Sequence, residues 1–151
     1  MTKIKPHIYR KILEGIELRA IYLKSFEGKI NRDIIPKEAI ARISSKADFI
    51  IKTENRVEIS QKWDVIGKDK GTESEFLSIS LTYTIILDTK NEFTKEFFEI
   101  YKETNLALNI WPFVREFVNN MTARMNIPPL TLPLLKFTQR KPSKAPPKKS
   151  K

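Results

Sequence analysis

The amino-acid sequence predicts an α+β fold with a four-stranded antiparallel sheet, one long helix and an extended C-terminal arm. Three observations lead to this prediction: segments in which apolar and polar residues alternate, one segment with apolar residues at helical spacing, and a proline-rich apolar segment after it. The chain has 151 residues, enough for one domain with a hydrophobic core. It has no cysteine, which excludes a disulfide framework and thiolate chemistry.

The clearest strand spans residues 76–87, where apolar and hydroxyl side chains alternate. The apolar side chains that share one face are Leu77, Ile79, Leu81, Tyr83, Ile85 and Leu87. Residues 56–66 alternate in the same way, and their apolar side chains are Val57, Ile59, Trp63 and Val65. Because the glycine-bounded segment 67–71 separates these two strands, we expect an antiparallel hairpin with one buried face.

Three further segments complete the expected order of elements. Residues 16–26 form a candidate first strand, and their alternation slips near Ala20, as a β-bulge would cause. Residues 93–101 fit either a strand covered on both faces or a short helix. Residues 33–45 are expected to contain a short helix opened by Pro36, because proline suits the first helical turn.

The long helix is predicted over residues 109–125. Asn109 can cap its N-terminus, and Pro112 would fall in the first turn, where a missing N–H is harmless. Its apolar stripe consists of Ile110, Phe113, Val114, Phe117, Met121 and Met125. Three prolines follow within residues 128–135, so this leucine-rich arm is expected to be extended.

The net charge of +10 is concentrated near the C-terminus. All 18 acidic residues lie at or before Glu116, whereas residues 1–135 hold only 21 of the 28 basic ones and are almost neutral. Residues 138–151 are rich in lysine, proline and serine, which predicts a disordered basic tail. No apolar run reaches the roughly 20 residues of a membrane helix, and residues 1–10 show no secretory signal, so we expect a cytoplasmic protein.

The sequence gives no indication of catalytic chemistry. His7 is the only histidine, the glycines are too scattered for a phosphate-binding loop, and the acidic residues lie on separate elements. We therefore expect no enzyme activity, no metal and no cofactor, and an enzyme that uses carboxylates alone ranks last among the alternatives.

The predicted helix and arm together resemble a known family. The helix begins Ile110-Trp111-Pro112-Phe113-Val114-Arg115-Glu116-Phe117-Val118, and the arm reads Pro128-Pro129-Leu130-Thr131-Leu132-Pro133. This combination resembles the carboxyl-proximal signature of the SecB export chaperones, in which an aromatic-rich helix start precedes an arm of prolines and leucines. The resemblance covers roughly residues 16–136, so we assign residues 1–137 to a SecB-like domain.

The resemblance implies a holdase, a chaperone that binds unfolded or precursor polypeptides without ATP, in protein export or in a chaperone-dependent toxin–antitoxin system. It also implies a homotetramer, built as a dimer of dimers with the long helices between two sheets. The client-binding residues that follow are Trp111, Phe113, Leu130, Leu132 and Leu134. The subunit-interface residues are Phe117, Met121 and Met125. Packing within one subunit is the alternative for each of these side chains.

Two features depart from the family pattern. The residues after Phe137 cannot form the second helix that follows the arm in SecB proteins. The chain is basic whereas SecB proteins are typically acidic, which argues against docking on the motor SecA. The alternative function is a nucleic-acid- or ribosome-associated module acting through the basic tail, although the tail lacks the interleaved aromatic residues that stack on bases.

Overall fold

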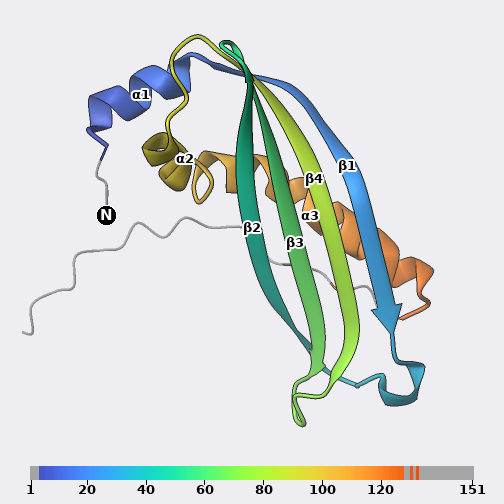
Figure 1. Ribbon diagram of the computed structural model, residues 1–151. Coiled ribbons are helices and arrows are strands. Elements are labelled where there is room, and N and C mark those ends of the chain that lie inside the picture. The colour runs from blue at the N-terminus through green and yellow to red at the C-terminus, as the bar shows by residue number, and fades with distance from the viewer. Residues whose placement is uncertain (1–3, 128–129, 131, 133–151) are drawn as a thin grey trace, which may run out of the picture.

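The computed structural model describes residues 4–127, 130 and 132 (Figure 1). Its elements are α1 (Pro6–Glu14), β1 (Ile16–Ile30), a 3₁₀ turn η1 (Arg32–Ile34), β2 (Ala39–Thr53), β3 (Arg56–Asp69), β4 (Glu75–Thr89), α2 (Lys95–Tyr101) and α3 (Asn105–Arg124). The four strands form one antiparallel sheet, and α3 crosses behind it in Figure 1. The predicted α+β class is therefore confirmed, while the predicted basic tail, residues 138–151, lies outside the described residues.

The strands lie in the order β1-β4-β3-β2. The predicted hairpin of β3 and β4 is confirmed, with Val65 opposite Ile79 and Ile59 opposite Ile85. β2 and β3 form a second hairpin, and β1 pairs with β4. Because β1 and β2 occupy opposite edges of the sheet, the connection through η1 must cross its end, as Figure 1 shows.

One face of the sheet is buried against the helices because most apolar residues of β3 and β4 point to that side. The largest of the fully buried apolar residues on these strands are Val57, Ile59, Val65, Ile79, Leu81, Ile85 and Leu87. Serine and threonine residues occupy the opposite face of β4, where most are only partly buried. This division is the expected outcome of period-two alternation in an antiparallel sheet with one solvated face.

The long helix α3 begins at Asn105 and is 20 residues long. The prediction that Asn109 caps it is therefore wrong, and Pro112 lies inside the helix instead of in its first turn. Proline at this position removes one backbone N–H, but Pro112 is exposed, so water can solvate the carbonyl left without that donor. The row that α3 buries against the sheet includes Ile110, Val114 and Val118, spaced four residues apart.

Two short helices pack at the end of the sheet around a group of aromatic rings. Thr94 caps α2 by accepting a hydrogen bond from the backbone N–H of Phe97 at 3.1 Å. Phe97 is fully buried, and its ring lies 4.8 Å from the ring of Tyr9 on α1 and 5.2 Å from that of Phe93. The N-terminal helix α1, which was not predicted from the sequence, is therefore attached to the core through Tyr9 and the buried Ile12.

Other sequence predictions had mixed outcomes. The helix expected within residues 33–45 is wrong, because Ala39–Thr53 is the edge strand β2 and only Arg32–Ile34 forms a helical turn. Residues 93–101 contain α2, which confirms the helical alternative for that segment. The bulge expected near Ala20 is confirmed by a register shift in the pairing of β1 with β4.

Candidate functional site

An apolar surface runs along α3 beside the free edge strand β1. Phe113 is 41% exposed on α3, and Phe26 is 60% exposed on β1. The ring of Phe117 meets that of Phe26 edge-on, with 5.3 Å between the ring centroids. Met121 and Met125 follow along the same side of α3 and are partly buried against the core. These five residues are called the β1–α3 surface below.

The sequence of α3 explains why this surface remains accessible. Its apolar residues form two neighbouring rows, each with a spacing of four residues. The first row, Ile110, Val114 and Val118, is fully buried against the sheet. The second row consists of Phe113, Phe117 and Met121, which are exposed or partly buried. The helix therefore carries a wider apolar arc than its contact with the sheet covers, which is typical of a helix that meets a partner.

Two aromatic contacts join α3 to the sheet. Trp111 is only 5% exposed, and its ring lies 5.4 Å from that of Trp63 on β3. Tyr83 on β4 donates a hydrogen bond from its hydroxyl to the backbone carbonyl of Phe113 at 3.2 Å. Burial raises the pKa of Tyr83 to about 12, and the negative charge of Glu116 adds to this rise. The hydroxyl therefore stays protonated at neutral pH and holds α3 against the sheet.

The described part of the C-terminal arm returns along α3. The backbone N–H of Leu130 donates to the hydroxyl of Thr122 at 3.1 Å. Further along, Arg115 Nε donates to the carbonyl oxygen of Leu132 at 3.0 Å. Leu132 is buried and Leu130 is partly buried, so only the side chain of Leu130 is accessible to a ligand. Leu134, the remaining predicted client-binding residue, lies outside the described residues.

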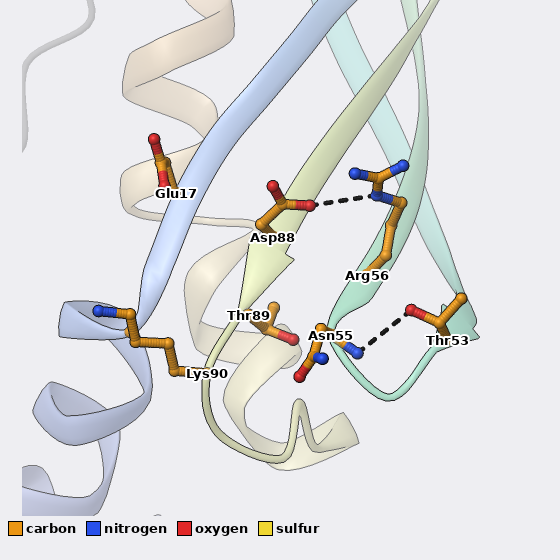
Figure 2. A pocket seen from close by; sticks show the side chains of 8 residues that line it. Glu17, Thr53, Asn55, Arg56, Asp88, Thr89 and Lys90 are labelled. Atoms are coloured by element: carbon orange, nitrogen blue, oxygen red, sulfur yellow. Dashed lines mark hydrogen bonds and ion pairs between the residues drawn. The ribbon is translucent and has the colours of Figure 1, made fainter.

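A polar pocket of about 650 Å³ lies at the end of the sheet, where β1, β3 and β4 meet (Figure 2). Asp88 is central to it: one carboxylate oxygen accepts from Arg56 Nε at 3.1 Å, and the other pairs with Arg19 Nε at 3.1 Å. Glu17 and Lys90 complete the charged lining. Because Asp88 on β4 pairs with one arginine from β1 and one from β3, we assign this network to holding the three strands together.

The described residues were also compared with the requirements of a metal site and of a membrane-spanning helix. No group of three or more histidine, cysteine, aspartate or glutamate residues there is arranged to hold a metal ion. Likewise, none of the helices among the described residues combines the length and the apolar character needed to cross a membrane.

Sequence reasoning found most of the β1–α3 surface but missed part of it. Phe113, Phe117, Met121 and Met125 follow from helical spacing alone. Phe26 was not predicted, because its place beside Phe117 depends on how α3 crosses β1. The signal available in the sequence was a phenylalanine at the end of the predicted first strand, residues 16–26.

The fold of the described residues is similar to that of a solved SecB-like chaperone. The SecB-like chaperone Rv1957 of Mycobacterium tuberculosis, solved in complex with a ChAD peptide from the antitoxin HigA1, superposes with a TM-score of 0.76 at 18% sequence identity. The match covers 87% of this chain and 99% of Rv1957.

Other comparisons add nothing to this assignment of fold. A protein of unknown function from Streptococcus agalactiae matches with a TM-score of 0.41 at 14% identity, over 79% of this chain and 97% of that protein, which is too distant to carry an argument. No family model matches the chain, and no curated protein sequence does.

Proposed function

We propose that this protein is a chaperone that binds unfolded polypeptides without ATP. The observation that carries the proposal is the β1–α3 surface, where aromatic and methionine side chains are left accessible beside a free strand edge. Contiguous exposed apolar residues of this kind are uncommon on monomeric proteins and mark interaction surfaces. The shared fold with Rv1957, which was solved with a bound peptide, supports the same conclusion.

In this proposal client binding centres on Phe113 of the β1–α3 surface and on Leu130 of the arm, because both side chains are at least partly accessible. Trp111 and Leu132 are buried and act from beneath by fixing α3 and the arm. Leu134 is proposed to continue the apolar surface along the arm. Phenylalanine and leucine bind apolar segments by burying apolar surface area and not by a specific pattern of hydrogen bonds. This mode of binding suits clients of many sequences.

Self-association through the rest of the surface is part of the same proposal. Phe117, Met121 and Met125 are partly buried in one subunit, and a second α3 packed on them would bury them fully. Within the part of the chain that the structure describes, β1 pairs only with β4, so its other edge offers a second contact between copies. Together these two contacts would generate a dimer of dimers, and the mass of the native assembly tests it directly.

The proposed clients are an antitoxin or exported precursors in the cytoplasm. The antitoxin peptide on Rv1957 supports the first of these. Docking on SecA is not proposed, because the chain carries a net charge of +10. Binding of nucleic acid through residues 138–151 remains the alternative prediction, and it requires an affinity that falls steeply with salt and disappears when the tail is deleted.

The test is suppression of aggregation. Purified protein is added to a chemically denatured model client, and light scattering is followed without ATP. We expect suppression near stoichiometric amounts, and we expect the same result without residues 138–151. No suppression at a large excess of chaperone would contradict the proposal.

A pair of substitutions on α3 localises the activity. Phe113→Gln removes the most exposed aromatic side chain of the helix and should weaken suppression several-fold. Leu108→Gln makes a similar change at a residue with nearly the same exposure, 42%, but outside the β1–α3 surface. It should leave suppression near the wild-type level, and equal losses in both variants would show that the surface is not specific.

A further inference from the structure

Two buried polar atoms of β3 have no hydrogen-bond partner within the described part of the chain. They are Oε1 of Gln61 and Nε1 of Trp63. Gln61 is 2% exposed and Trp63 is 5% exposed, so both side chains are almost completely removed from solvent. Folded proteins rarely leave such atoms unpaired, because each loses its hydrogen bonds to water without replacement. An unpaired acceptor and an unpaired donor two residues apart on one strand therefore need an explanation.

Both residues line the same pocket, which has a volume of about 630 Å³. It lies between the edge strand β2 and the start of α3, at the turn that joins α2 to α3. Its size follows from the sequence. Ser45 faces Trp63 across the β2–β3 pair, Ala47 faces Gln61, and Ala107 approaches from α3. Three small side chains thus leave space beside the two residues that carry the unpaired atoms.

The lining of this Gln61–Trp63 pocket restricts what it can bind. The Gln61 oxygen accepts a hydrogen bond and the indole N–H of Trp63 can only donate one, so a matching group must supply one donor and one acceptor. The charged residues around the pocket are two lysines and two acids, namely Lys46, Asp48, Lys102 and Glu103. Because these charges balance, the pocket favours a neutral group over an anion or a cation. A neutral planar group with an adjacent donor and acceptor is an amide.

We propose that the Gln61–Trp63 pocket binds an amide group of a bound polypeptide. The amide carbonyl accepts from Trp63 Nε1, and the amide N–H donates to Gln61 Oε1. This inference rests on the proposed function, which supplies polypeptide as the ligand. Two features of the structure connect the pocket to that function: among the described residues β2 is an edge strand paired only with β3, and Trp63 packs on Trp111 of α3, the helix that also carries Phe113.

The pocket extends the proposed recognition beyond apolar contact. A peptide-bond amide is common to every polypeptide, so such a pocket would add affinity without demanding a sequence. The side-chain amide of asparagine or glutamine has the same chemistry and would instead add a preference for those residues. The two sources are distinguished by the test below.

The test follows the Trp63 indole N–H by nuclear magnetic resonance in protein labelled with ¹⁵N, with the assignment made from Trp111→Phe. One probe is an apolar peptide of alanine and leucine with a single central glutamine, and the second has leucine in place of that glutamine. A saturable downfield shift of the Trp63 proton with both probes supports a backbone amide. A shift with the glutamine probe alone supports a side-chain amide. If peptide binds, as shown by fluorescence anisotropy, and the proton does not move with either probe, the inference is overturned.

A matched pair of variants provides a second test. Ser45→Val fills the pocket from β2, whereas Ser44→Val makes the same change on the neighbouring residue, whose side chain points to the opposite face. We expect Ser45→Val to weaken peptide binding at least tenfold and Ser44→Val to leave it unchanged, with similar thermal unfolding midpoints. If Ser45→Val binds peptide with wild-type affinity and still suppresses aggregation, amide binding in the Gln61–Trp63 pocket is refuted while the chaperone proposal stands. Absence of both peptide binding and suppression would overturn both.

Discussion

The hydroxyl of Thr122 fixes the arm to α3, so its removal should release the arm. Thr122 is 0% exposed, and its Oγ1 accepts the Leu130 N–H at 3.1 Å while donating to the carbonyl of Val118 at 3.0 Å. Thr122→Val keeps the shape of the side chain and leaves the Leu130 N–H without its acceptor. An unpaired buried donor costs about 1–3 kcal/mol, and because Leu130 is only partly buried we expect about 1 kcal/mol.

Two measurements follow this prediction, thermal unfolding and hydrogen exchange at the Leu130 amide. A loss of about 1 kcal/mol corresponds to a fall in Tm of about 2–4 °C for a chain of this size, and Leu130 exchange should accelerate. Thr122→Ser is the control, because it loses a methyl worth about 1 kcal/mol but keeps the hydroxyl, so the Leu130 amide should stay protected. Equal protection of Leu130 in the valine variant and the wild type would refute the reasoning.

Three further predictions concern the core. Gln61→Met removes a buried acceptor that has no partner, so it should raise the free energy of unfolding, measured in urea, by about 1 kcal/mol. A decrease of that size would show that Gln61 Oε1 does have a hydrogen-bond partner in the folded protein. Burial raises the pKa of Tyr101 from 10.0 to about 12, so the folded state retains the proton more strongly. Stability should therefore be complete below pH 10.0 and decline as the pH rises toward 12, and Tyr101→Phe should reduce that decline in pH-dependent denaturation. A Cβ at Gly67 would lie 3.0 Å from Leu77 Cβ, so Gly67→Ala should cost about 1–3 kcal/mol in urea denaturation. At Gly28 an added methyl meets the flexible end of a methionine, and a loss there as large as at Gly67 would contradict this explanation.

The sequence predicted the elements whose burial is one-sided and regular. Strands β3 and β4 are buried on one face along most of their length, so apolar residues mark every second position. The edge strand β2 is exposed at most positions, and only Ile43, Ala47 and Phe49 are partly buried. Its alternation is therefore weak, which explains why a helix was expected there. Helix α1 was missed because it buries only Ile12 completely.

The candidate site was predictable where it depends on local spacing and not where it depends on distant contacts. Phe113 and Phe117 share a row of α3 because of the helical repeat alone. That Trp111 is buried while Phe113 is accessible depends on the angle at which α3 crosses the sheet. The Gln61–Trp63 pocket arises from small residues on β2 and α3 that meet only in the folded chain. Contacts between residues so far apart in the sequence cannot be predicted from a local pattern.

Crosslinking from α3 tests most directly whether the β1–α3 surface binds unfolded polypeptide. A photoreactive phenylalanine analogue is placed at Phe113 or, in a separate protein, at Leu108, and each is irradiated with a denatured client. The two positions have nearly equal exposure, 41% and 42%, so accessibility alone would give equal yields. We predict client crosslinks from position 113 and few or none from position 108. Equal yields, or crosslinks from position 108 alone, would contradict the account.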